Sequence, residues 1–352
     1  MAANGIRGAI AVDAMGGDLG VAEVVRAVQL AFENLPGLGK IVLVGKERLL
    51  TRLIKAAKLD GEERLSVHHA SEVISMDEKP IRSIKQKKDA SIIKAVELVK
   101  NDVCQAVVSC GNTGSLMACG TLKLRPMEGV ERPALATIMP SKVQHFILLD
   151  VGANTTPKPE HLVHNAILGS HYARIVLGRK KPRVGLLSIG TEEIKGTGLV
   201  QDTHALLKKI KPLVNYHGLI EGFQVFNNEV DVVVCDGFTG NVVLKICESL
   251  FFSLKGYLKE EIRKTPFRMA GAFLSKGAYK NMQNQLNPER YGGAPLLGLR
   301  GNILKAHGSS NQYALMNAIR IASEIIAHNM NAEALADITE ANSILKNVSN
   351  NE

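Results

Sequence analysis

Short apolar runs that end in glycine-rich polar turns recur along this chain. The clearest lies in VDVVVCDGFTGNVVL (Val230 to Leu244), where the run Val232 to Cys235 does not alternate with polar residues. Such a run is typical of a strand buried on both faces of a parallel sheet. A helix is predicted directly after the turn. Its N-terminus would therefore direct unpaired backbone N–H groups at a bound anion.

Four further stretches repeat this arrangement of strand and turn. They are AIAVDAMGGD (Ala9 to Asp18), AVVSCGNTG (Ala106 to Gly114), FILLDVGAN (Phe146 to Asn154) and VGLLSIGTEE (Val184 to Glu193). A parallel sheet gathers such turns along one edge, the carboxyl edge, where open α/β folds bind ligands. The pattern predicts an α/β fold with a mostly parallel sheet and a binding site at that edge.

The remaining pattern alternates helices with strands, as in βαβ units. Apolar residues at helical spacing predict helices over Ala22 to Phe32, Ser91 to Val99, Thr113 to Leu124, Pro159 to Leu177 and Leu199 to Lys209. Apolar runs predict further strands over Ile41 to Val44, Leu65 to His68, Val103 to Val108 and Arg183 to Ile189. We therefore expect helices packed against the sheet.

Two stretches depart from this alternation and predict antiparallel hairpins. In Ala134 to Asp150, two apolar runs are separated only by Ser141 to Gln144, which is too short for a crossover helix. Gly292 to Leu299 and Gly301 to Lys305 predict a second hairpin around Arg300.

The polar stretch His307 to Ser310 opens a predicted helix that runs to about Ile326. A hydroxyl side chain accepts a hydrogen bond from a free N–H group of the first helical turn. We therefore expect Ser309 or Ser310 to be the N-cap.

Composition narrows the class of partner. The 352 residues carry a formal charge of +9, with 45% hydrophobic and 22% charged residues, as in an ordinary soluble protein. The absence of Trp and an aromatic content of 4% argue against stacking platforms for nucleic acid. The positive charge favours an acidic partner, which could be a nucleic acid, an anionic membrane surface, a phosphorylated ligand or an acidic protein.

The cysteine pattern favours a reducing cytoplasm. The five cysteines are odd in number and lack CxxC spacing, so neither a disulfide framework nor a zinc site is indicated. The N-terminal stretch has no apolar signal region, and no stretch approaches the ~20 apolar residues that span a bilayer. Any contact with a membrane is expected to be peripheral.

The stretch Leu250 to Arg290 differs from the rest. It holds eight basic and three acidic residues, a net charge of +5. On a helical wheel, Phe267, Phe273 and Leu274 share one arc with Ala270, and basic residues lie opposite. This pattern is typical of a basic amphipathic helix at a membrane surface. An apolar arc that packs against the core is the alternative, and the pattern alone favours it.

Polar side chains follow the predicted strands. Those expected at strand ends are Asp13, Asn112, Asp150, Asn154, Glu192 and Asp236, with Lys195, Lys305 and His307 nearby as cations or proton carriers. Taken singly, each acid is expected to cap a helix or shape a turn. Together with helix N-termini, these groups suit a small anion such as phosphate. No nucleotide-binding fingerprint occurs.

Metal binding and cysteine catalysis are less favoured. His68, His69, His161, His164 and His171 do not form a closed set of ligands. Cys110 could be activated by the helix N-terminus that follows it. Buried packing is expected for the other cysteines, which are Cys104, Cys119, Cys235 and Cys247.

With these turns assembled, the chain resembles the phosphate acyltransferases of bacterial phospholipid synthesis, the PlsX family. The matching segments are AVDAMGGDLG, SCGNTGSLMACG, EGVERPALAT, LLDVGAN, KPEHLVHNAILGS, PRVGLLSIGTEEIKG, VDVVVCDGFTGNVVLK and YGGAPLLGLRGNILKAHGSS. They extend from Ala11 to Ser310. This family commonly has Ala where this chain has Cys110, which argues against an obligatory cysteine nucleophile.

The resemblance implies a fold. We expect a three-layer α/β/α architecture with a mostly parallel sheet, like that of isocitrate dehydrogenase and the phosphate acetyltransferases. Residues 1–330 would form one large domain, with two subdomains as the alternative. A protruding helical hairpin would be inserted at 250–290, and residues 331–352 would form a C-terminal helix and tail.

The resemblance also implies a reaction. Acyl carrier protein bearing an acyl chain and inorganic phosphate would be converted to acyl phosphate and free carrier protein, without a cofactor or metal. We assign catalytic roles to Lys195, Asn241 and His307. The expected substrate- and phosphate-binding residues are Asp13, Gly16, Gly17, Asn112, Thr113, Asn154, Thr191, Glu192, Asp236, Gly240 and Ser309.

The partners implied are acyl carrier protein, a second copy of the chain, the inner face of the cell membrane, and a glycerol-3-phosphate acyltransferase that uses the acyl phosphate. The residues expected to contact membrane or carrier are Arg263, Lys264, Phe267, Arg268, Phe273, Leu274 and Lys276. An acyl-CoA donor, a non-catalytic membrane scaffold for lipid enzymes and a dinucleotide dehydrogenase are the alternatives.

Overall fold

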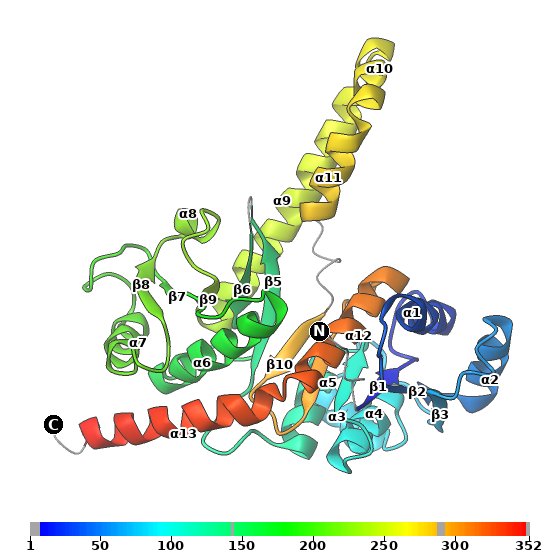
Figure 1. The fold of residues 1–352 in the computed structure, drawn as a ribbon, viewed down its shortest axis with the longest axis horizontal. Coiled ribbons are helices and arrows are strands. Elements are labelled where there is room, and N and C mark those ends of the chain that lie inside the picture. Colours follow the sequence, from blue (N-terminus) through cyan, green and yellow to red (C-terminus); the bar gives the residue numbers. More distant parts are fainter. Residues whose placement is uncertain (1–7, 142–143, 287–292, 350–352) are drawn as a thin grey trace.

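One eleven-stranded sheet runs through the molecule in the order β3-β2-β1-β4-β11-β10-β5-β6-β9-β7-β8 (Figure 1). The computed structural model describes residues 8–141, 144–286 and 293–349. The strands are β1 Ala9–Asp13, β2 Lys40–Gly45, β3 Leu65–His69, β4 Ala106–Ser109, β5 Ala134–Pro140, β6 His145–Leu149, β7 Val184–Leu187, β8 Tyr216–Ile220, β9 Val232–Val234, β10 Ala294–Leu297 and β11 Asn302–Lys305.

Helices cover both faces of this sheet. They are α1 Val21–Asn34, α2 Glu47–Ala56, α3 Pro80–Gln86, α4 Ser91–Lys100, α5 Thr113–Cys119, the π-helical turn η1 Gly120–Leu124, α6 Pro159–Val176, α7 Gly198–Lys209, α8 Gly222–Val225, α9 Gly237–Arg263, α10 Pro266–Leu274, α11 Lys276–Leu286, α12 Gln312–Ala327 and α13 Met330–Ser349. Successive residues of β1 belong to different core clusters, Ile10 and Val12 to one and Ala11 to the other. The core therefore has a layer on each face of the sheet, as predicted for a three-layer α/β/α fold.

The strands form two groups that run in opposite directions. Strands β6, β9, β7 and β8 are mutually parallel, and so are β3, β2, β1, β4 and β11. Between the groups, β10 pairs antiparallel with both β11 and β5, and β5 pairs antiparallel with β6. The prediction of a single carboxyl edge was therefore wrong, because the antiparallel strands reverse the direction of the sheet.

The register nevertheless brings the two carboxyl edges together. Leu304, next to the end of β11, pairs with Pro295. Leu149, the last residue of β6, pairs with Ala136, and the pairing of Leu296 with Leu135 places both pairs in one row. From this row the two groups of strands extend in opposite directions. The turns that follow both groups therefore meet near the centre of the molecule.

Both predicted hairpins are present. The first is β5–β6, whose connecting residues 142 and 143 lie outside the described part of the chain. The second is β10–β11, which encloses Arg300; the predicted start at Gly292 lies outside the described residues.

The predicted N-cap of α12 was wrong. The cap is Asn311, whose Oδ1 accepts hydrogen bonds from the backbone N–H groups of Tyr313 and Ala314. Ser309 instead contacts the ring of His307 at 2.8 Å. The predicted strand over Val103 to Val108 also begins later, at Ala106.

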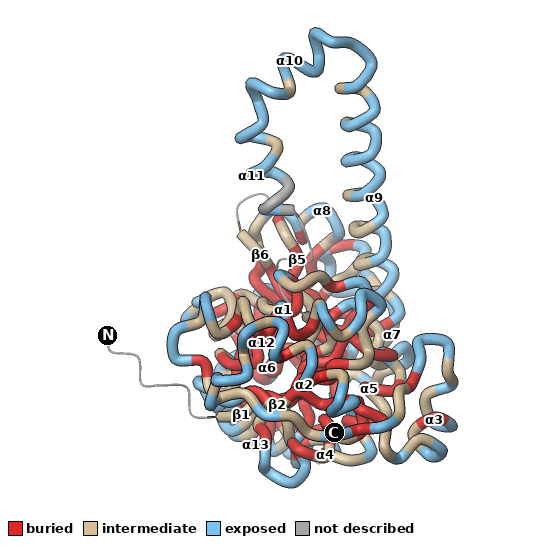
Figure 2. Tube along the Cα trace, turned by 90° about the vertical axis from the view of Figure 1, so that its right-hand side faces the viewer, coloured by how far each residue is buried: buried red, intermediate tan, exposed pale blue. Residues whose placement is uncertain are grey.

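Helices α9, α10 and α11 project from the body as a hairpin (Figure 1). The hairpin is largely exposed, whereas the strands are buried (Figure 2). The side chains of α10 lie in solvent, with Phe267 89% exposed, Phe273 74% exposed and Leu274 85% exposed. The alternative in which this apolar arc packs against the core is therefore wrong. Among the described helices, none combines the length and apolar character needed to cross a bilayer.

Gly240 and Gly256 test how α9 is anchored. A Cβ atom on Gly240 would lie 2.0 Å from the carbonyl oxygen of Asp150, whereas one on Gly256 would meet no atom within 4 Å. We expect Gly240→Ala to lower the free energy of unfolding by at least about 2 kcal/mol because backbone must move. Gly256→Ala, in the same helix, should raise it by about 0.5–1 kcal/mol. Urea unfolding of both variants measures these changes in free energy. Equal changes in the two variants would contradict the anchoring of α9 at Gly240.

Candidate active site

A cavity of about 490 Å³ opens where the turns of the two strand groups meet. Its polar lining comes from β5, from the end of β11 and from the segments after β4, β9 and β11, and includes Thr113, Thr137, Asn241, Lys245, Glu248, Lys305, His307, Ser309 and Ser310. Its apolar lining comes mainly from β5 and α9, and includes Met117, Leu135, Ile138, Met139, Val151, Leu244, Phe252 and Ala314. A volume in this range and a mixed lining are typical of sites for small organic ligands.

Lys305 places a half-buried cation in this cavity. It is the last residue of β11, and its Nζ donates to the backbone carbonyl oxygens of Cys110, at 3.4 Å, and of Ala306. Burial lowers the pKa of the ammonium group, because desolvation disfavours the charged form. From the sequence, we expected Lys305 only to be a cation near the polar residues at the strand ends. Its position at the end of a strand, directly before a predicted helix, was the signal for a greater role.

His307 and Ser309 follow Lys305 in the same turn. The Nδ1 atom of His307 accepts a hydrogen bond from the backbone N–H of Ser309 at 3.3 Å and lies 2.8 Å from its Oγ. Since a backbone N–H can only donate, the neutral ring carries its proton on Nε2. Nε2–H has no acceptor among the described residues, so it is available to a ligand in the cavity.

Asn241 reaches the cavity from the first turn of α9. Its side chain lies over Gly152, where a Cβ atom would stand 3.7 Å from Asn241 Cγ. Gly152 has a φ of +129°, which glycine adopts readily. The side-chain amide of Asn241 makes no hydrogen bond to a described residue. The predicted residues Asn241, His307, Ser309 and Thr113 are thus brought together in one cavity.

Other predicted residues build the turns instead of lining the cavity. Asp236 caps α9, with Oδ1 accepting from the backbone N–H of Thr239 at 2.9 Å. The Asp150 carboxylate accepts from four backbone N–H groups, those of Leu135, Gly152, Ala153 and Asn154. The Asn154 amide donates to Pro133 O and to Asp150. Gly240 allows α9 to approach Asp150.

The first turn of the chain is also structural. Asp13 is buried and accepts from Met15 N and Ser109 Oγ, and burial raises its pKa. A Cβ atom on Gly16 would lie 2.6 Å from Gly111 Cα, and one on Gly17 would lie 3.4 Å from Cys110 Cβ. These residues therefore join the turns after β1 and β4.

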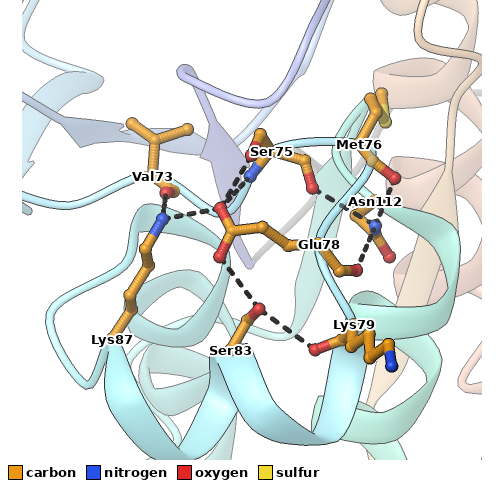
Figure 3. A network of polar contacts seen from close by, with 8 residues as sticks. All are labelled: Val73, Ser75, Met76, Glu78, Lys79, Ser83, Lys87 and Asn112. Atoms are coloured by element: carbon orange, nitrogen blue, oxygen red, sulfur yellow. Dashed lines mark hydrogen bonds and ion pairs between the residues drawn. The ribbon is translucent and has the colours of Figure 1, made fainter.

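Asn112 holds a neighbouring loop in place (Figure 3). Its Oδ1 accepts from Ser115 N at 2.9 Å and so caps α5. Its Nδ2 donates to the carbonyl oxygens of Ser75, Met76 and Glu78, at 3.2, 2.8 and 3.3 Å. Both ends of the amide are therefore occupied by protein, and no donor of this side chain is left for phosphate.

Glu78 fixes the same loop from the other side (Figure 3). Its carboxylate accepts from Lys87 Nζ at 2.6 Å, from Ser75 and from Ser83 Oγ. These hydrogen bonds lower the pKa of Glu78 to about 2, and the bond from Lys87 has the largest effect. Met76 in this loop approaches Gly308, where a Cβ atom would lie 2.7 Å from Met76 Cε. The loop thus packs against the turn that carries His307.

The loop after β7 does not line the cavity. Lys195, Thr191 and Glu192 are exposed there, and Lys195 N donates to Glu192 O at 2.9 Å. Strand β7 pairs parallel with β9, so this loop lies at the same carboxyl edge of the sheet as the turn before Asn241. The catalytic assignment of Lys195 remains a prediction.

Cys110 is an unsuitable nucleophile. It is 2% exposed, and burial raises the pKa of its thiol to about 12. A thiol must ionise to attack, so this group is inert near neutral pH.

Comparison with known proteins places the fold. A phosphotransacetylase from Streptococcus pyogenes superposes with a TM-score of 0.62 at 17% identity, covering 92% of this chain and 95% of that one. A branched-chain phosphotransacylase from Enterococcus faecalis gives 0.58 at 14% identity, covering 90% and 98%. The chain therefore has the phosphotransacetylase fold.

Sequence relatives define the family. The profile of the family described as fatty acid synthesis protein matches residues 9–333. A phosphate acyltransferase of Desulfitobacterium hafniense is 44% identical over 318 residues, 90% of this chain and 93% of the relative. One of Syntrophotalea carbinolica is 42% identical over 331 residues, 94% and 93%. The chain belongs to this family, as its sequence motifs predicted, and is an acyltransferase.

Asn112→Asp tests the role of the amide in the loop. The substitution keeps the oxygen that caps α5 but replaces the donor that faces three carbonyl oxygens. We expect the free energy of unfolding to fall by about 1–3 kcal/mol and amide hydrogen exchange in residues 71–79 to accelerate. Asn227→Asp, the same change at an exposed residue, is the control. Equal stability of the two variants would contradict the assignment.

Proposed function

We propose that this protein transfers an acyl group from acyl carrier protein to inorganic phosphate, forming acyl phosphate for phospholipid synthesis. The observation that carries the proposal is the cavity, which combines the half-buried cation Lys305 and free donors with an apolar lining from β5 and α9. The polar groups suit phosphate and a thioester carbonyl, and the apolar lining suits an acyl chain. Family membership supports the same reaction.

The chemistry needs no covalent enzyme intermediate. A phosphate oxygen attacks the thioester carbonyl carbon, the C–S bond breaks, and the thiolate leaves with the bonding electrons. Lys305 would hold phosphate, and the Asn241 amide would donate to the carbonyl oxygen as it becomes negative. His307 would protonate the leaving thiolate from Nε2. Holding both reactants in one cavity supplies the remaining rate enhancement.

Lys305→Met and Lys195→Ala test separately whether each of these two lysines is needed for the reaction. We expect Lys305→Met to reduce acyl-phosphate formation from acyl carrier protein and phosphate by at least about 100-fold, because it removes the cation that we assign to phosphate. We expect the same of Lys195→Ala, with an unchanged melting temperature. A wild-type rate for Lys195→Ala would contradict the catalytic assignment of Lys195.

The same assay decides between donors. Acyl-CoA is the alternative, and a rate with acyl-CoA but none with acyl carrier protein would overturn the proposal. Acyl-phosphate formation by neither donor would support a non-catalytic scaffold. A nicotinamide dinucleotide should not shift the melting temperature, since no nucleotide fingerprint is present.

The hairpin is proposed as the contact with carrier and membrane. Phe267, Phe273 and Leu274 are exposed near Arg263, Lys264, Arg268 and Lys276. At 1.5 Å per residue, the 27 residues of α9 extend for about 40 Å, so the tip stands clear of the body. Apolar side chains beside cations suit an anionic lipid surface, and the charge attracts an acidic carrier.

Replacement of Phe267, Phe273 and Leu274 by Ser tests the membrane contact. We expect the triple variant to lose co-sedimentation with phosphatidylglycerol vesicles and to keep its melting temperature, because none of the three is buried. Phe223→Ser, which removes a 65% exposed aromatic residue on α8, is the control. Undiminished binding of the triple variant would contradict the contact.

A homodimer is part of the same proposal. Along α9, Ile246, Leu250 and Leu254 are 56–60% exposed, and a second copy would cover such a face.

Acyl phosphate hydrolyses readily, so we also propose direct transfer to a glycerol-3-phosphate acyltransferase at the inner membrane face.

A further inference from the structure

A second cavity of about 410 Å³ lies at the opposite ends of β4 and β11. It is lined by Val99, Lys100, Asp102, Leu122, Lys123, Leu124, Arg125, Arg300 and Gly301. The lining thus carries four basic side chains and one carboxylate. Only Lys123 forms an ion pair with a described residue, Glu97 at 2.7 Å. The other three cations have no acidic partner within the described part of the chain.

Arg125 is held in a conformation that few residues adopt. It ends the π-helical turn η1 with φ 66° and ψ 156°. This region of backbone conformation is essentially restricted to glycine, so an arginine there is strained. π-helical turns and strained residues both occur frequently at functional sites. The strain is thus an observation independent of the charge.

The backbones of the two arginines are hydrogen-bonded to each other. Arg300 N donates to the carbonyl oxygen of Arg125 at 3.1 Å, and Arg125 N donates to that of Gly120 at 3.2 Å. The Arg300 side chain is oriented by a bond from Nε to Pro126 O at 3.3 Å. Its terminal NH1 and NH2 groups remain without a described partner. The cavity therefore presents guanidinium groups on a defined backbone.

This cavity is separate from the candidate active site. Gly301 lines it just before β11 begins, whereas Lys305 lines the first cavity at the other end of the same strand. At ~3.3 Å per residue, their Cα atoms are about 13 Å apart. A ligand can therefore occupy one cavity without entering the other.

We propose that this second cavity binds the phosphate groups of a small phosphorylated ligand. Guanidinium groups bind phosphate oxygens in bidentate fashion, and two of them beside Lys100 match a group with more than one negative charge. The cavity is concave and within the volume range of small-ligand sites, and its described lining has no aromatic residue for stacking nucleic acid bases.

Calorimetric titration of the full-length protein with inorganic pyrophosphate tests the proposal. We expect a binding event that survives Lys305→Met, because that lysine lies in the other cavity. Arg300→Ala and Arg125→Gly should each weaken it at least about tenfold, since each removes a charged hydrogen-bonding group. Arg52→Ala, which removes an exposed arginine on α2, should leave the affinity unchanged.

Arg125→Gly also separates binding from folding. Glycine adopts the backbone conformation at 125 without strain, so its melting temperature should equal or exceed that of the wild type. Binding that is abolished by Lys305→Met and kept in both arginine variants would place pyrophosphate in the first cavity and overturn the proposal. Absence of binding to the wild type would also overturn it. Neither result depends on whether acyl phosphate is formed.

Discussion

The contact between the start of α9 and the turn after β6 determines the geometry of the candidate active site. Gly237 N donates to Asn154 O at 2.7 Å, and Gly240 packs where a Cβ atom would lie 2.0 Å from Asp150 O. The Asp150 carboxylate holds the turn by binding its backbone N–H groups. This close approach places Asn241 over Gly152 and sets the direction in which α9 leaves the body. The cavity and the hairpin therefore depend on the same few glycines and on one buried carboxylate.

The reversal of the sheet explains why the cavity has two kinds of lining. In a wholly parallel sheet, a site at the carboxyl edge is built from turns, which are polar. Here β5 and β10 connect two opposed groups of strands, and the apolar side chains of Leu135, Ile138 and Met139 line the cavity beside the turns. A phosphate and an acyl chain need these two environments side by side. The antiparallel strands thus supply the apolar lining, which the polar turns could not.

The sequence predicted the turns, the two hairpins and the family because these features depend on local pattern. It could not predict which turn residues reach the cavity, since that depends on partners distant in sequence. The Asn112 amide donates to the carbonyl oxygen of Met76, 36 residues away, so its donors are occupied within the protein. Asn154 and Asp13 are occupied in the same way. Strand β8 was also missed, because His217 and Gly218 interrupt its apolar run.

The two cavities share structural elements, and this follows from how α5 and η1 pack. Thr113 at the start of α5 lines the first cavity, and Arg125 at the end of η1 lines the second. Gly120 joins the two segments and packs on β11, where a Cβ atom would lie 2.6 Å from Ile303 Cδ1. Strand β11 also carries Lys305 at its carboxyl end, and Gly301 directly precedes its other end. The packing of Gly120 on β11 thus joins η1, which ends beside the second cavity, to the strand that carries Lys305 into the first.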